Sequence, residues 1–482
     1  MSKETTVAQR KISPFDEEKI QRLFGHEAAE DEDPQRLQEY YFKPSTYDQV
    51  VTELPLRIVV GHKGIGKSAL FQVALAENRE MNLLAISVKP DDVLDIATES
   101  NDFLKSVRNW KVGIREIIER EASRRLDVDI SSTSGSDLLL MRLAKELGAQ
   151  GCVDELGAEF LRSPQIIVYI DDLDRGWQGS TKDVRRISAL LSAVRDLSNE
   201  DRGIKFRISL RSDVYFLVRT SDESTDKVEG SVVWNSWTNN EIFALLVKRI
   251  ETFYGRDVDY DDLSSRSSAS LAHYLDPVFE PRFQGRGHWR NAPIYRVMMS
   301  LVRKRPRDLV KLCTLAARSA NRTKHNLILT GDLEASFEEY SQGRVQDAIN
   351  EYNSELRDIE RLLFGMRPSK KEASAKAGYV YPTESLIRKI KNIQEQGKFY
   401  FASGREASPQ ELAAFMYKIN FITARKESGG LIHRKYFEEQ RYLQSKFADF
   451  GYDWEVHPAY RWALQPSDVR SVFDSLELSA DD

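Results

Sequence analysis

The sequence predicts an α/β protein whose core is a parallel β-sheet covered by helices on both faces. Apolar runs of strand length recur along the first half of the chain, at residues 56–60, 83–88, 165–170 and 206–210. Helical segments separate these runs, and the first run breaks into a glycine-rich turn. Strands that alternate with helices are typical of parallel sheets, in which each strand is buried on both sides.

The remaining elements follow from apolar spacing. Residues 1–45 are polar, with an acidic stretch at 30–33 and an aromatic end at 40–42, and they predict a short helical lead-in. Segments 100–162 and 181–198 carry apolar residues at helical spacing. The pattern is helical again from Thr238 to about 365, opened by the capping box that Thr238 forms with Glu241.

The last part of the chain has a different order of elements. Helices are predicted near 383–395 and 408–418, followed by short strands at 421–424 and 431–433 around a glycine turn. Helix, helix and hairpin is the order of a winged helix. The predicted organisation is therefore a helical lead-in (1–45), a sheet core (46–235), a helical lid domain (236–365) and a winged-helix-like α+β module (366–482).

Composition narrows the class of protein. The 482 residues are 41% hydrophobic and 30% charged, which excludes a wholly disordered or fibrous chain. The net charge of -5 marks neither a nucleic-acid nor a membrane binder. Two cysteines, Cys152 and Cys313, are too few for a disulfide framework and suit a reducing compartment. With no apolar stretch at the N-terminus and no run of about 20 apolar residues, we expect a cytoplasmic protein without membrane partners.

One motif carries specific chemistry. It fits the pattern G-x-x-x-x-G-K-[ST], follows a strand and opens a helix, and it reads Gly61-His62-Lys63-Gly64-Ile65-Gly66-Lys67-Ser68, with Ala69 next. Its glycines let backbone N–H groups turn toward phosphate oxygens at the positive end of a helix. We expect Lys67 to reach the β- and γ-phosphates of a nucleotide and Ser68 to bind Mg²⁺.

A second carboxylate-bearing strand completes this expectation. The run 166–170 ends in Asp171 and Asp172, at the edge of a parallel sheet where ligands bind. We expect Asp171 to hold Mg²⁺ through its water shell and Asp172 to polarise the attacking water. The alternative is a strand-end pair that caps the next helix.

At these positions the chain resembles KAP-type P-loop ATPases of the wider STAND group. The segment Ile170-Asp171-Asp172-Leu173-Asp174-Arg175 is similar to their acidic motif, and Leu210-Arg211-Ser212-Asp213 to their sensor segment. Segments 305–309 and 457–461 resemble the lid-helix motif and the end of the C-terminal module. The chain departs from the usual Gly-x-Pro lid motif, since it has Lys304-Arg305-Pro306.

The resemblance implies that Arg211 faces the γ-phosphate and that Arg307 contributes from the lid. From the residues alone, Arg211 could instead pair with Asp213, and Arg307 could simply stand in the first turn of a helix that begins at Pro306. Arg175 could act across a subunit interface or form a salt bridge with a neighbouring aspartate.

The function predicted from these observations is a Mg²⁺-dependent ATPase that works as a nucleotide-driven switch. Adenine is favoured because no Asn-Lys-x-Asp motif for guanine is present. The resemblance implies a homo-oligomer or a partner effector protein, and a role in bacterial defence against phage. A DNA-binding protein is the alternative, because residues 361–446 hold 17 Lys/Arg against 8 Asp/Glu, with Arg425, Lys426, Arg434 and Lys435 on the wing.

Overall fold

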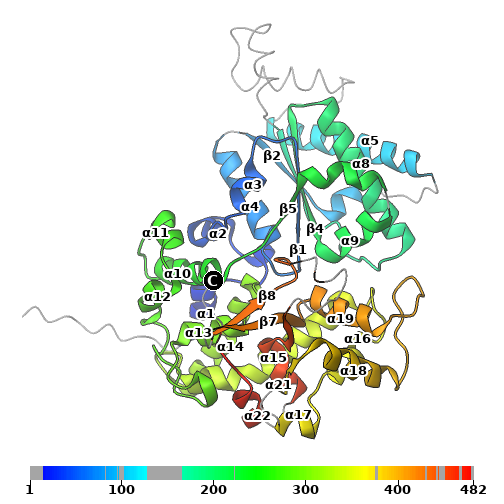
Figure 1. Cartoon of the computed structure of the whole chain (residues 1–482). Coiled ribbons are helices and arrows are strands. Elements are labelled where there is room, and N and C mark those ends of the chain that lie inside the picture. Colours follow the sequence, from blue (N-terminus) through cyan, green and yellow to red (C-terminus); the bar gives the residue numbers. More distant parts are fainter. Residues whose placement is uncertain are drawn as a thin grey trace, which may run out of the picture.

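The computed structural model describes residues 15–81, 83–94, 96, 102–126, 166–221, 223–374, 378–428, 431–440, 443, 451–465 and 469–478. A five-stranded sheet forms the centre of the upper part of the molecule in Figure 1. All its neighbouring strands are parallel. In spatial order they are β2 (Leu84–Val88), β3 (Ile166–Ile170), β4 (Ile204–Arg211), β1 (Leu56–Gly61) and β5 (Val232–Trp234).

Alternate residues of the central strands serve opposite faces of the sheet, as the pleat requires. Ile58 and Val60 of β1 belong to one buried cluster, and Val59 belongs to another. The first face is covered by α5 (Phe103–Leu126), α8 (Thr181–Glu200) and α9 (Ser212–Ser221). The second face is covered by α2 (Pro34–Tyr40), α3 (Tyr47–Val51) and α4 (Lys67–Glu80). The predicted parallel sheet with helices on both faces is therefore confirmed.

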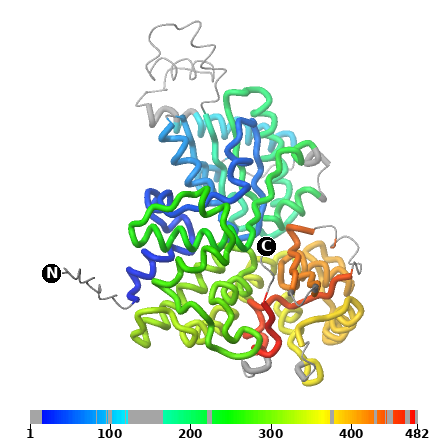
Figure 2. Tube along the Cα trace, turned by 60° about the vertical axis from the view of Figure 1, so that its left-hand side comes forward, coloured from blue at the N-terminus to red at the C-terminus, as the bar shows by residue number. Residues whose placement is uncertain are grey.

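A helical region follows the sheet. Its first helix, α10 (Asn239–Phe253), begins with the predicted capping box, in which Glu241 N donates to Thr238 Oγ1 at 3.1 Å. The others are α11 (Tyr260–Ser265), α12 (Ser268–Leu271), α13 (Ile294–Leu301), α14 (Pro306–Thr323) and α15 (Thr330–Tyr352). The N-terminal helix α1 (Glu17–Phe24) packs into the same hydrophobic core, and in Figure 2 the blue N-terminal segment lies against these green helices.

The C-terminal module is built on a second, antiparallel sheet with the strand order β6-β9-β7-β8. Its strands are β6 (Val380–Tyr381), β7 (Ile422–Ser428), β8 (Leu431–Lys435) and β9 (Asp453–Val456). Its helices are α16 (Ile359–Gly365), α17 (Lys370–Ser374), α18 (Thr383–Gln394), α19 (Pro409–Lys418) and α21 (Arg461–Leu464). The last helix, α22 (Val469–Asp474), packs into the core of the helical region. The expected order of two helices followed by a hairpin is present in α18, α19, β7 and β8.

Helix α15 joins the two lower parts of the molecule. Leu333, Phe337 and Tyr340 lie in the core of the helical region, whereas Val345 and Tyr352 lie in the core of the C-terminal module. A single 23-residue helix thus runs from one core into the other. Both cores are therefore built partly from the same helix.

Two further observations complete the fold. The predicted helical segment 100–162 is present as α5 up to Leu126, and its remainder, with Cys152, lies outside the described residues. Among the residues that are described, no helix is both long and apolar enough to cross a membrane.

Candidate nucleotide-binding site

The glycine-rich loop lies between the end of β1 at Gly61 and the start of α4 at Lys67. Gly64 and Gly66 adopt φ values of 80° and 96°, in the left-handed region that favours glycine. A Cβ atom on Gly64 would also lie 3.1 Å from the Cβ of Arg307. Gly64 is therefore required both by the turn and by the close approach of the helical region, and Gly66 by the turn.

Lys67 lies inside this loop. Its Nζ donates to the carbonyl oxygens of Gly61 at 2.9 Å and His62 at 3.3 Å. Burial lowers the pKa of Lys67, while the carboxylates of Asp174 and Asp171 oppose that effect. The ammonium group is thus held among main-chain oxygens that an anionic ligand could replace.

The register of the sheet brings the candidate residues to one edge. Ile170 pairs with Ile208, so Asp171 emerges beside Ser209, whose Oγ donates to Asp171 Oδ1. The main-chain N–H of Asp172 donates to the same carboxylate oxygen at 3.0 Å. These contacts fix the direction of the Asp171 side chain at the carboxyl end of β3.

Asp172 and Asp174 have different environments. Asp172 has φ 59° and accepts a hydrogen bond of 2.8 Å from Arg175 Nε, which realises one of the salt bridges considered for that arginine. Burial raises the pKa of Asp172, and Arg175 partly offsets this effect. Asp174 is buried and accepts from the main-chain N–H of Arg211 at 3.0 Å. Burial raises the pKa of Asp174 against the opposing charges of Lys67 and Arg211.

Arg211 forms the expected alternative pair with Asp213. Its Nε and Nη2 donate to the two carboxylate oxygens at 3.1 and 2.6 Å, and Nη2 also donates to Glu351 O at 3.0 Å. Burial disfavours the guanidinium charge, but Asp213 and Glu351 raise the pKa of Arg211 above its ordinary value. Among the described residues no partner is found for Nη1, so this atom is the donor most open to a ligand.

Arg307 brings the helical region to the loop. Pro306 occupies the first turn of α14, as the helix-start alternative predicted, and Arg307 N lies 3.4 Å from Gly64 O. Its Nε donates to Glu27 O in the N-terminal segment at 3.0 Å. The residue therefore links the loop, the helical region and the N-terminal segment.

A cavity of about 540 Å³ opens at this edge of the sheet. That volume lies within the range of small-molecule and cofactor sites, roughly 300–1,000 Å³. The predicted residues that line it are Lys63, Gly64, Gly66, Lys67, Ser68, Ala69, Asp171, Asp172, Arg211 and Arg307.

Three predicted nucleotide-binding residues, Gly61, His62 and Ile65, are not among the lining residues. Ile65 is buried in the core of the helical region, and its carbonyl accepts from Trp237 Nε1 at 2.8 Å. The side chain of His62 points away from the cavity toward Tyr352, with 2.8 Å between Nδ1 and the hydroxyl oxygen. Contact between His62 and a phosphate would therefore have to come from its main chain.

Sequence reasoning assigned no role to several lining residues. Asp174, Ser209 and Asn350 are among them. The N-terminal segment and the helices α10 and α14 supply His26, Ala29, Leu37, Tyr40, Arg249 and Val310. Only Asp174 carried a signal, as part of the acidic motif; the others come together through tertiary packing of segments without a motif.

The donor set fits a hard cation. Ser68 and Asp171 line the same cavity, and hydroxyl and carboxylate oxygens are the ligands that Mg²⁺ accepts. Mg²⁺ commonly keeps several water molecules and takes one or two protein ligands beside substrate phosphates. Ser68 and Asp171 are therefore sufficient protein ligands for a phosphate-bound Mg²⁺.

The basic hairpin of the C-terminal module differs from expectation. Arg434 is buried, and its Nε donates to Glu455 Oε2 at 2.8 Å. Arg425 is also buried and pairs with Glu477. Of the four cations placed on the wing in the DNA-binding alternative, only Lys426 and Lys435 keep substantial exposure. An exposed position on the wing is therefore wrong for Arg425 and Arg434.

Sheet, glycine-rich loop and acidic strand end together define a P-loop nucleotide-binding core. Comparison with known proteins adds a match to a family described as "FunZ-associated C-terminal helical domain" over residues 260–349, which is less than half of the chain. A curated relative, the "Putative transposon gamma-delta 80.3 kDa protein" of Escherichia coli K12, is 23% identical over 524 aligned positions. The alignment covers 95% of this chain and 70% of the relative.

Solved structures that resemble this chain do so with low TM-scores. The ORC2 protein of Aeropyrum pernix, in ADPNP–ADP complexes, gives a TM-score of 0.43 at 11% identity, covering 91% of this chain and 97% of that one. Cdc6p of Pyrobaculum aerophilum gives 0.33 at 12% identity, covering 95% and 99%. The RuvB protein of Thermotoga maritima gives 0.31 at 8% identity, covering 82% and 88%. At these scores the likenesses add no functional argument.

Proposed function

We propose that this protein is a Mg²⁺-dependent ATPase that uses ATP binding and hydrolysis as a conformational switch. The observation that carries the proposal is the meeting of Lys67, Ser68 and Asp171 on one cavity, with Arg211 and Arg307 on its wall. A P-loop lysine, a Mg²⁺-binding hydroxyl and a strand-end carboxylate are the parts that phosphoryl transfer requires.

Each residue has a defined task in the proposed reaction. The loop amides and Lys67 bind the β- and γ-phosphates, and Ser68 and Asp171 hold Mg²⁺, which neutralises charge on the phosphates. Asp172 orients a water molecule whose oxygen bonds to the γ-phosphorus while the bond to the bridging oxygen breaks, releasing ADP and phosphate. The raised pKa of Asp172 makes its carboxylate a better acceptor for the proton of this water molecule.

The nucleoside end of ATP would lie between the N-terminal segment and the helical region. Leu37 and Val310 give this end apolar surface, and the Tyr40 ring lies 4.5 Å from the guanidinium carbon of Arg249. ATP binding would then bridge three parts of the chain, which is what a nucleotide-driven switch needs.

The assignment to a particular class of ATPase rests on the resemblance to KAP-type STAND ATPases. It supports a switch whose output passes through a partner effector protein or a second copy of the chain. A defence role rests on that resemblance alone, and the curated relative named for a transposon gives it no support. DNA binding by the basic hairpin is the weaker alternative, because Arg425 and Arg434 are already engaged in ion pairs.

The decisive experiment measures binding and hydrolysis by the purified full chain. We expect ATP binding by calorimetry, phosphate release in the presence of Mg²⁺, and loss of that release when EDTA removes the ion. GTP is the control nucleotide, and weaker binding of GTP is expected. Absence of ATP binding in a folded, Mg²⁺-supplemented sample would refute the proposal.

A further inference from the structure

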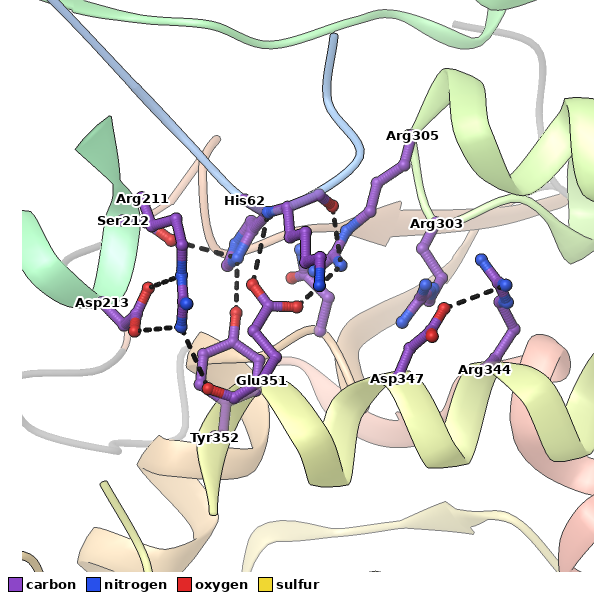
Figure 3. A network of polar contacts seen from close by, with 12 residues as sticks. His62, Arg211, Ser212, Asp213, Arg303, Arg305, Arg344, Asp347, Glu351 and Tyr352 are labelled. Carbon is purple, nitrogen blue, oxygen red and sulfur yellow. Dashed lines mark hydrogen bonds and ion pairs between the residues drawn. The ribbon is translucent and has the colours of Figure 1, made fainter. Parts of the chain in front are cut away.

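The far side of the glycine-rich loop is held by the last turn of α15. Lys63 N donates to Glu351 Oε1 at 3.2 Å, and His62 Nδ1 lies 2.8 Å from the hydroxyl of Tyr352 (Figure 3). Glu351 is 5% exposed and Tyr352 is 1% exposed. Two consecutive residues of one helix thus contact two consecutive residues of the loop, and neither Glu351 nor Tyr352 lines the nucleotide cavity.

Glu351 also reaches the neighbouring arginines. Its main-chain oxygen accepts from Arg211 Nη2 at 3.0 Å, and its Oε2 lies 3.6 Å from Arg305 Nη1 (Figure 3). Burial would raise the pKa of Glu351, but the charges of Arg305, His62 and Arg211 lower it below the ordinary value. One buried, charged residue is therefore in contact with both the loop and the arginine that faces the phosphate end.

The other nitrogen of His62 contacts the C-terminal module. His62 Nε2 lies 2.5 Å from Glu438 Oε1. Glu438 has a side chain 12% exposed and accepts from Asn420 Nδ2 at 3.0 Å. Burial opposes its charge, but His62 and the hydrogen bonds lower the pKa of Glu438 to about 2. A charged carboxylate of the module is thus fixed on a residue of the loop.

We propose that Glu351 is a positioning residue for the glycine-rich loop, and that the contact between His62 and Glu438 couples loop occupancy to the docking of the C-terminal module. This inference rests on the proposed nucleotide site. The inference goes beyond that site because it assigns functions to residues that do not line the cavity.

The contacts form a continuous path. Lys67 Nζ donates to the main-chain oxygen of His62, and the imidazole of the same residue contacts Glu438. A bound phosphate competes for the Lys67 ammonium and removes its bond to His62 O. The main chain at His62 then loses a partner and can shift. Because the imidazole of the same residue contacts Glu438, such a shift changes that contact, and the two loop states have different docking energies.

Coupling of this kind is reciprocal. If nucleotide binding changes the docking equilibrium by a certain factor, docking must change nucleotide affinity by the same factor. Measured couplings between sites are commonly about five- to 150-fold. Removing the charge of Glu438, which lies outside the cavity, is therefore expected to change ATP affinity, although the variant alters no group that ATP touches.

The test compares Glu438→Gln and Glu351→Gln with Glu406→Gln. Glu406 belongs to the same module, and its half-exposed side chain pairs with Lys398 away from the loop. We measure ATP affinity by calorimetry and backbone hydrogen exchange of α19 and Phe437 with and without ATP. In the wild-type chain, ATP should change exchange in these segments.

Glu438→Gln is expected to abolish most of the ATP-dependent change in hydrogen exchange of α19 and Phe437. It is also expected to change ATP affinity about fivefold or more. Glu351→Gln is expected to weaken ATP binding and to speed exchange of the Lys63 amide. Glu438→Asp, which keeps the charge, should restore part of the wild-type behaviour, and Glu406→Gln should change nothing. If Glu438→Gln does not fold, His62→Asn, which removes the imidazole that contacts Glu438 and keeps the main chain of the loop, takes its place with the same expected loss of the ATP-dependent change.

Two results would overturn the inference in distinguishable ways. If the wild-type chain binds ATP and the folded Glu438 and Glu351 variants behave like Glu406→Gln, the coupling is wrong and the nucleotide site stands. If the wild-type chain binds no ATP, the proposed function fails and the coupling fails with it.

Discussion

Gly61 and Arg211 are Cα partners in the parallel pairing of β1 with β4. The first residue of the glycine-rich loop and the arginine of the sensor-like segment thus leave the sheet side by side. Because of this register, the guanidinium of Arg211 starts from a position beside the glycine-rich loop. No loop has to rearrange to bring it near phosphates bound there. The relationship gives the proposed role of Arg211 a geometric basis that sequence spacing alone could not provide.

Arg211→Ala is predicted to lower ATP affinity more than ADP affinity. An arginine that contacts only the γ-phosphate adds a charge-assisted hydrogen bond of about 1.5–3 kcal/mol to ATP alone, which is roughly a ten- to 150-fold preference. Calorimetric titration of both nucleotides measures the ratio. Arg219→Ala, on the exposed end of α9, is the matched control. If the ratio of ATP affinity to ADP affinity is unchanged, Arg211 has only a structural role in its ion pair with Asp213.

Lys67→Ala is predicted to weaken ATP binding by at least about tenfold while the chain stays folded. The substitution removes the compact charge that pairs with the terminal phosphates, and it frees the carbonyls of Gly61 and His62. Binding is measured by calorimetry and folding by circular dichroism. Lys398→Ala removes an exposed lysine of the C-terminal module as a control. Wild-type affinity in the folded Lys67 variant would contradict the site.

Asp171→Asn and Asp172→Asn are predicted to fail at different steps. Asp172→Asn should keep Mg²⁺-ATP binding and lose turnover, because orientation of the water molecule is lost. Asp171→Asn should raise the Mg²⁺ concentration needed for half-maximal turnover, because a metal ligand loses its charge. Turnover across a Mg²⁺ series separates the two effects, with Asp257→Asn on the exposed surface as control. Equal, mild losses in both variants would make the pair a structural cap.

Local patterns predicted much of the fold. The four longer strands of the parallel sheet are apolar runs buried on both faces, and the helix at Thr238 was marked by its capping box. The strand β5 was missed because three residues, Val232–Trp234, are too short to show a period. The two-residue strand β6 was missed for the same reason.

The site was predicted only where a motif carries it. The loop and the acidic strand end are local sequences, whereas Glu351 and Glu438 come from helical and loop segments whose packing no spacing reveals. The basic hairpin was misread because charge was counted without the strand period. Ile432 and Arg434 share one face of β8, and that face is buried, so Arg434 needs a buried partner.

That partner gives the last prediction, a pH-dependent stability of the C-terminal module. Glu455 is 1% exposed and bonds to Arg434 and Arg461. Burial would raise the pKa of Glu455, but the two arginines lower it to about 2. A glutamate in an unfolded chain has a pKa of about 4.3. The folded carboxylate therefore contributes roughly 3 kcal/mol to the free energy of unfolding above that pH. The contribution is lost as the pH falls from about 4.3 toward 2.

Urea unfolding of the wild-type chain and Glu455→Gln between pH 7 and 3.5 checks this prediction. At pH 7 the variant should be less stable by about 3–5 kcal/mol, because both arginines remain buried without their carboxylate. The free-energy difference should be constant down to about pH 5 and should narrow below it, because Glu455 of the unfolded wild-type chain takes up a proton while the folded carboxylate stays charged. Glu406→Gln, at a half-exposed ion pair, should show no comparable narrowing. A difference that stays constant to pH 3.5, or that is absent at pH 7, would mean that the Glu455 charge does not stabilise the module.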